Sequence, residues 1–99
     1  MTVFEALADE TRRSIVKLLA ERERSVTEIT THFSLSQPAI SKHLRVLRDA
    51  GIADAEINGK RRIYRLRSDG LVDAEAWFAH NRRLWERRVE ALRVHTEEA

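Results

Sequence analysis

Two short helical patterns separated by a three-residue break constrain the fold of this chain more than any other feature of its sequence. Ser25 and Glu28 match a capping box, in which a hydroxyl and a carboxylate each satisfy a backbone N–H at the start of a helix. After the break, Pro38 fits the first turn of a second helix. Gly51 ends this helix, where a residue free to adopt a positive φ is needed. The pattern predicts a helix-turn-helix over about residues 25–51.

The apolar period changes after the second helix from that of a helix to that of a strand. Asn58-Gly59 is the strongest two-residue hairpin signal, because a type I′ turn needs a positive φ at both positions. It separates residues 53–57 from residues 61–66, and the hairpin extends over about residues 53–67. A helix-turn-helix followed by such a hairpin is the winged-helix arrangement, a mostly helical α+β fold. The whole chain is the right length for one such domain, over residues 1–99.

The C-terminal part of the chain returns to a helical pattern, and we expect one long helix over about residues 70–96. Aromatic and aliphatic residues recur along it every seven positions, which makes a stripe too wide to face water. We interpret this stripe as core and homodimer interface in preference to a ligand pocket, because helix-turn-helix proteins commonly act as dimers. The residues expected there are Trp77, Phe78, Leu84, Trp85 and Leu92.

Charge is unevenly distributed along the chain, although the formal net charge is only +2. Residues 36–67 hold eight Lys or Arg against three Asp or Glu, and the rest of the chain is slightly acidic. A basic segment on such a body is the pattern expected of a nucleic-acid-binding protein.

The second helix places its polar side chains opposite a buried face formed by Ile40, Leu44 and Leu47. First-turn residues of a recognition helix contact base edges, where a Gln amide pairs with adenine and an Arg with guanine. The basic run at the hairpin tip can reach phosphates or a minor groove. For the polar face of the second helix and for the hairpin tip alike, the alternative is an ordinary solvated surface. His43, beside the buried face, is expected to be a partly buried structural histidine. The candidate DNA-binding residues are Gln37, Pro38, Ser41, Lys42, Arg45, Lys60, Arg61 and Arg62.

The sequence lacks the residues that disulfides, metal sites and catalytic sites require. The chain has no cysteine, which excludes disulfides, thiolate metal sites and a cysteine nucleophile. His95 and Glu98 share a one-turn spacing, but this pair is two ligands short of a tetrahedral metal site. No catalytic motif is present, so we expect no enzyme, no cofactor and no metal. Without a long apolar span or a signal-peptide layout, a soluble, cytoplasmic protein with no membrane partner is expected.

Four segments together resemble the ArsR/SmtB family of transcriptional repressors: Leu7–Arg13, Ser36–Leu44, Leu47–Ile52 and the hairpin tip Asn58–Arg62. The resemblance covers nearly the whole chain. It implies a homodimeric repressor that binds an inverted repeat in double-stranded promoter DNA through its wing and its recognition helix, Gln37–Asp49. It also implies that the first and last helices form the dimer, which adds Val3, Phe4 and Leu7 to the expected interface.

The sequence departs from this family where other members bind metals. Members that sense arsenic or soft metals carry Cys-x-Cys in the first helix of the helix-turn-helix, where this chain has Val26–Thr30. Other members bind zinc in the last helix through an Asp-x-His pair followed by His-x-x-His or His-x-x-Glu. His95 and Glu98 match the second of these pairs, but the Asp-x-His pair is missing at the corresponding upstream spacing. The final helix most resembles an autorepressor-like branch without metal-binding cysteines. We predict a metal-free repressor; the alternatives are a metal- or small-molecule-responsive repressor with an effector site at the dimer interface, and a winged helix that binds a protein.

Overall fold

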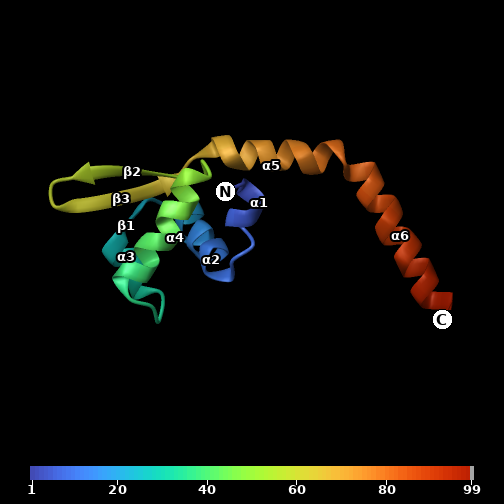
Figure 1. Cartoon of the computed structure of the whole chain (residues 1–99), viewed down its shortest axis with the longest axis horizontal. Coiled ribbons are helices and arrows are strands. Elements are labelled where there is room, and N and C mark those ends of the chain that lie inside the picture. The colour runs from blue at the N-terminus through green and yellow to red at the C-terminus, as the bar shows by residue number, and fades with distance from the viewer. Residues whose placement is uncertain (99) are drawn as a thin grey trace.

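Helices and a three-stranded antiparallel sheet alternate along residues 1–98, the part of the chain that the computed structural model describes (Figure 1). Side chains are described as far as Val94. Helices α3 (Val26–Thr31) and α4 (Gln37–Asp49) with strands β2 (Ala53–Asn58) and β3 (Arg61–Leu66) confirm the predicted winged helix. In order, the elements are α1 (Val3–Ala6), α2 (Glu10–Glu21), β1 (Arg24–Ser25), α3 (Val26–Thr31), α4 (Gln37–Asp49), β2 (Ala53–Asn58), β3 (Arg61–Leu66), α5 (Ser68–His80) and α6 (Arg82–Glu98).

Side-chain caps begin both helices of the helix-turn-helix. Ser25 Oγ accepts a hydrogen bond from the backbone N–H of Glu28 at 3.1 Å, and Glu28 Oε1 accepts one from the backbone N–H of Ser25 at 3.4 Å. Ser36 caps α4 in the same way through the N–H of Ala39, and Pro38 lies in the first turn. Each such cap contributes about 1 kcal/mol, so the sequence determines where both helices start.

The end of α4 confirms the role predicted for Gly51. Gly51 has a φ of +76°, and its N–H donates to the carbonyl of Arg48 at 3.0 Å. The N–H of Ile52 donates to the carbonyl of Leu47 at 2.9 Å. These two bonds form a Schellman motif, which satisfies the last carbonyls of the helix and turns the chain toward the wing.

The core lies where α4 packs against α2, α3 and β2, and where α2 and α3 pack against β3. The face of α4 predicted to be buried, Ile40, Leu44 and Leu47, is fully inaccessible to solvent. Burying each of these side chains contributes about 1.5–3 kcal/mol, which fixes the rotation of α4 about its axis. The opposite face of α4 must then face solvent. The largest fully buried side chains are Ile15, Ile29, Ile40, Leu44, Leu47 and Ile52.

The wing is the predicted hairpin with its turn shifted by one residue. Asn58 pairs with Arg61 at the end of the ladder, so Gly59 and Lys60 are the two turn residues. Gly59 has a φ of +65°, and no non-glycine residue of the described chain has a positive φ. The prediction of a type I′ turn centred on Asn58-Gly59 was therefore wrong: glycine in the first central position is typical of type II′. The short strand β1, which pairs with β3, was not predicted.

The C-terminal helix is divided in two, whereas the sequence predicted one helix over about residues 70–96. The break is at Asn81, whose backbone has φ −98° and ψ 8°. The side-chain amide of Asn81 donates to the carbonyl of Trp77 at 2.8 Å, the carbonyl that also accepts its backbone N–H. A side chain that binds its own backbone competes with regular helix geometry. Figure 1 shows that α6 bends away from α5 here, at the end of the molecule opposite the wing.

Helix α5 approaches the end of α4 closely at Gly70. The N–H of Gly70 donates to the carbonyl of Gly51 at 3.1 Å. A Cβ atom at this position would lie 2.7 Å from the carbonyl oxygen of Ala50 and 3.1 Å from Cγ2 of Val3. No side chain other than the hydrogen of glycine fits between these groups, so Gly70 allows α1, α4 and α5 to meet.

We predict that Gly70→Ala lowers the free energy of unfolding by about 1–3 kcal/mol, the usual penalty for an overpacked site. Val72→Ala, on the same helix but 55% exposed, should change it by less than about 0.5 kcal/mol. Urea denaturation at equal protein concentrations measures both values. A Gly70→Ala protein as stable as the wild type would show that α5 can move off Ala50 without penalty.

Candidate nucleic-acid interface

A hollow of about 240 Å³ brings together the first turns of α3 and α4 and the tip of the wing. Five of the eight candidate DNA-binding residues line it: Gln37 and Ser41 from α4, and Lys60, Arg61 and Arg62 from the wing. These two groups are far apart in the sequence, so their proximity is a result of the fold. The first turn of α3 forms the remaining wall, which sequence reasoning did not assign to the site. The lining residues from α3 and its cap are Ser25, Val26 and Thr27.

The other three candidates lie on the outer face of α4. Pro38, Lys42 and Arg45 are all exposed and do not line the hollow. They point away from the core, because the buried face of α4 lies on the opposite side of the helix. The outer face of α4 and the hollow therefore form one surface beside the wing.

Ion pairs divide the basic residues of the wing into two sets. Arg65 is held by Asp54 and Glu56 at 3.5 and 3.0 Å, and the hydrogen bond that it donates to Glu56, together with the charge of Asp54, raises its pKa. Lys60 and Arg62, by contrast, take part in no ion pair with any residue whose side chain is described. The positive charge available to a polyanion is thus concentrated at the wing tip and not at its base.

Arg61 has an acidic partner that the sequence did not reveal. Its Nη2 atom donates to Glu28 Oε1 at 3.2 Å, while Glu28 Oε2 accepts from Nη2 of Arg22 at 3.0 Å. The hydrogen bond from the backbone of Ser25, followed by that from Arg22, lowers the pKa of Glu28. The capping box identified Glu28 as a helix-start residue, but no sequence signal placed it beside the wing.

His43 is bound to the body of the protein and not to the hollow. Its side chain is 23% exposed, and its Nδ1 atom lies 3.4 Å from Nη1 of Arg12 and 3.9 Å from Oδ1 of Asp9. Arg12 also donates to the carbonyls of Ala6 and Glu5 at the end of α1. The prediction of a partly buried, hydrogen-bonded histidine is confirmed, and the contact links α4 to α1.

Known proteins similar to this chain identify its family. Residues 9–55 match the pattern of bacterial regulatory proteins of the arsR family. The transcriptional repressor SdpR of Bacillus subtilis is 36% identical over 75 residues, which make up 76% of this chain and 83% of that repressor. The HTH-type transcriptional regulator Rv2034 of Mycobacterium tuberculosis is 43% identical over 69 residues, 70% of this chain and 64% of that regulator. The chain belongs to the ArsR family.

Solved structures agree with this assignment. The crystal structure of an ArsR family transcriptional regulator superposes with a TM-score of 0.78 at 32% identity, covering 85% of this chain and 87% of the other. The resemblance stated from sequence motifs is confirmed, as is the winged-helix fold. The proteins of this family are DNA-binding transcriptional regulators and not enzymes.

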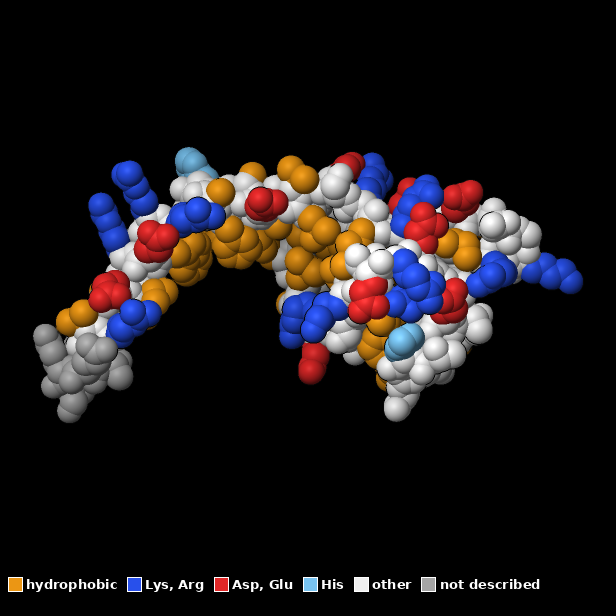
Figure 2. Space-filling view, turned by 180° about the vertical axis from the view of Figure 1, so that it is seen from behind, with side chains coloured by type: hydrophobic (Ala, Val, Ile, Leu, Met, Phe, Trp, Pro, Cys, Tyr) orange, Lys and Arg blue, Asp and Glu red, His pale blue; other side chains and the backbone are white. Residues whose placement is uncertain are grey.

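A second surface of this ArsR-family protein is apolar. Phe4 of α1 contacts Trp77 and Phe78 of α5 edge to face, with ring centroids 5.5 and 5.8 Å apart. Trp77 also lies 6.0 Å from Trp85 of α6. We call Phe4, Trp77, Phe78, Leu84 and Trp85 the aromatic face; each is between 43% and 52% exposed. Figure 2 shows hydrophobic side chains gathered on the inner side of the arch formed by α5 and α6, next to the body.

The remaining expected interface residues differ in burial. Val3 and Leu7 are partly buried and pack against the core, so they attach α1 to the body of the protein. Leu92, on α6, is 68% exposed.

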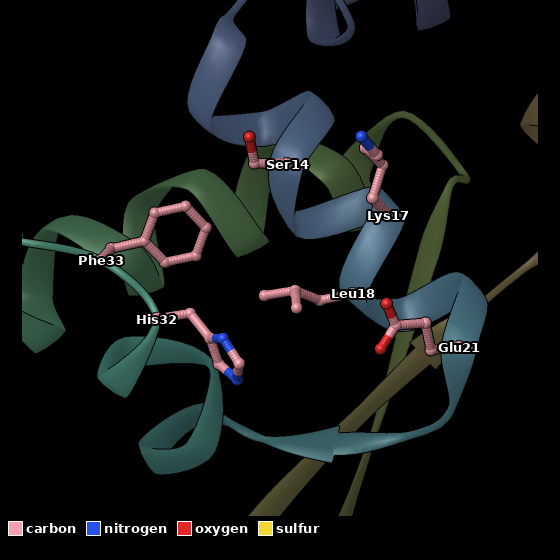
Figure 3. A pocket seen from close by; sticks show the side chains of 6 residues that line it. All are labelled: Ser14, Lys17, Leu18, Glu21, His32 and Phe33. Atoms are coloured by element: carbon pink, nitrogen blue, oxygen red, sulfur yellow. The ribbon is translucent and has the colours of Figure 1, made fainter.

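A larger hollow, of about 320 Å³, lies between α2 and the end of α3 (Figure 3). Its lining side chains are Ser14, Lys17, Leu18, Glu21, His32 and Phe33. Unlike the smaller hollow, it includes no residue of α4 or of the wing.

The described residues contain no cluster of three or more His, Asp or Glu that would hold a metal ion. The side chains of His95 and Glu98 lie outside the described ones. Every helix of the described chain is too short or too polar to cross a membrane.

Proposed function

We propose that this ArsR-family protein is a metal-free repressor that binds an inverted repeat in promoter DNA as a homodimer. The observation that carries the proposal is the single surface on which the first turn of α4 lies beside the wing tip. A recognition helix in a major groove and a basic hairpin on the neighbouring backbone or minor groove require this arrangement.

Gln37 and Arg45 are the side chains that we assign to base reading. Both are exposed on α4, Gln37 at its first residue and Arg45 two turns further on, and both can form bidentate hydrogen bonds to a base edge. Ser41 and Lys42 lie between them on the same helix, where they are suited to phosphate or base contacts. The wing tip then supplies phosphate contacts through Lys60 and Arg62, the cations without an acidic partner among the described side chains.

The aromatic face supports the homodimer. Half-exposed tryptophan and phenylalanine rings grouped on one surface are typical of an interface between proteins. Two recognition helices must be held roughly 34–36 Å apart to read adjacent half-sites, and a fixed dimer provides that separation. The aromatic face lies on α1, α5 and α6, so pairing through it leaves the hollow and the wing uncovered.

We predict that Gln37→Ala and Arg45→Ala each weaken binding to the preferred sequence by about 1–3 kcal/mol per half-site, the value of one bidentate base contact. Sequences selected from random duplexes provide the operator, and titration against operator and scrambled duplexes measures the effect. Lys17→Ala, which removes an exposed side chain of α2 that does not line the hollow beside the wing, is the matched control. An unchanged preference in both α4 variants would contradict the base-reading assignment.

We also predict that Arg62→Ala flattens the plot of log affinity against log salt concentration by about 1.8 for the dimer, because each of its two subunits then neutralises one phosphate fewer and each phosphate accounts for about 0.9. Arg65→Ala should leave the slope unchanged, because its guanidinium is already bound to Asp54 and Glu56. If the two variants had equal slopes, the wing tip would not be the part that meets the phosphates.

Trp85→Asp should yield a monomer that no longer binds the operator, because a carboxylate placed in a pairing surface would be buried without a partner. Trp85 is 47% exposed in the single chain, so the substitution leaves the core intact. Val72→Asp introduces the same charge at an exposed site of α5, outside the aromatic face, and should leave the dimer unchanged. Light scattering coupled to size-exclusion chromatography reports the mass, and a folded, dimeric Trp85→Asp protein would place the dimer contact elsewhere.

A further inference from the structure

We propose that Glu28, which lies outside the hollow, sets how well the protein distinguishes its operator from other DNA by holding Arg61 of the wing in one position. This inference rests on the proposed DNA-binding function. Glu28 would act as a positioning residue, since it acts through Arg61 and does not itself line the hollow.

The contact joins two parts of the DNA-binding surface. Arg61 Nη2 donates to Glu28 Oε1 at 3.2 Å, and the residues are 33 positions apart in the chain. Arg61 remains 63% exposed and lines the hollow. A guanidinium has five N–H donors, so this one bond leaves others free for a phosphate or a base.

Glu28 is itself held in place on its other side. Nη2 of Arg22 donates to its second carboxylate oxygen at 3.0 Å, and the N–H of Ser25 donates to the first oxygen at 3.4 Å. These hydrogen bonds lower the pKa of Glu28, so the carboxylate stays charged at neutral pH. A fixed, charged acceptor on α3 thus determines where the wing arginine lies relative to α4.

A side chain that is held before binding loses less conformational entropy on binding, and it fits one arrangement of phosphates better than others. The wing and α4 then meet a duplex in a fixed register, which favours the shape of the operator. The charge of Glu28 repels any duplex equally, so this effect cancels in the ratio of operator affinity to scrambled-duplex affinity. The ratio therefore isolates the positioning effect.

Glu28→Gln tests the proposal with little change of shape. Glutamine at this position retains the capping box, so α3 keeps its start. We expect the affinity ratio between operator and scrambled duplex to fall by about three- to tenfold, within the range of coupling between contacting residues. Thermal unfolding confirms that the variant is folded.

Glu56→Gln is the matched control. It also removes one negative charge from an ion pair with an arginine, here Arg65 of the wing. It should change the affinity for both duplexes alike and leave their ratio as in the wild type. Arg61→Ala completes a double-mutant cycle: it should lower the ratio, and adding Glu28→Gln to it should lower the ratio no further.

An unchanged ratio in Glu28→Gln would overturn the inference while leaving the DNA-binding function standing. So would an equal loss in the presence and absence of Arg61, because Glu28 would then act by another route. A wild-type protein with no preference for any duplex would overturn the proposed function, and the inference with it.

Discussion

The backbone contact between Gly70 and the turn that ends α4 is the constraint on which the rest of the arrangement depends. It places α5, which carries Trp77 and Phe78 of the aromatic face, directly against the end of α4, the helix that we assign to DNA recognition. Val3 of α1 packs at the same point, so three elements meet where there is no room for a side chain. The distance between the apolar surface and the outer face of α4 is therefore set by close packing, which resists deformation. Loops would not transmit such a fixed geometry.

Local signals were enough to predict much of this fold. Caps at Ser25 and Ser36 and a positive φ at Gly51 act over a few residues, so a short stretch of sequence contains them in full. The errors arose where one local preference competed with another. The pair Asn58-Gly59 favours a turn, but cross-strand pairing with Arg61 extends the ladder to include Asn58. The bend at Asn81 depends on one side-chain hydrogen bond, which an apolar pattern continuing through that position concealed.

The candidate site was predictable as a set of residues but not as a geometry. Amino-acid types identify the cations of the wing. Whether each cation is available to bind a phosphate depends on which carboxylates the fold places beside it. Arg65 meets Asp54 across the hairpin, and Arg61 meets Glu28 of a distant helix. A count of charges over a segment treats all these arginines alike, because it contains no distances. Pairings between residues far apart in the sequence require the tertiary structure.

The half-exposed rings on α1, α5 and α6 also bear on how such a regulator responds to its own abundance. When only paired chains present two recognition helices to the same duplex, the active species grows with the square of the single-chain concentration while most chains are unpaired. Occupancy of the promoter then rises steeply over a narrow range of expression level, whereas a monomeric binder would give a gradual response. In the homodimer that we propose, the strength of one apolar contact, far from any base pair, thereby sets the protein concentration at which the promoter becomes occupied.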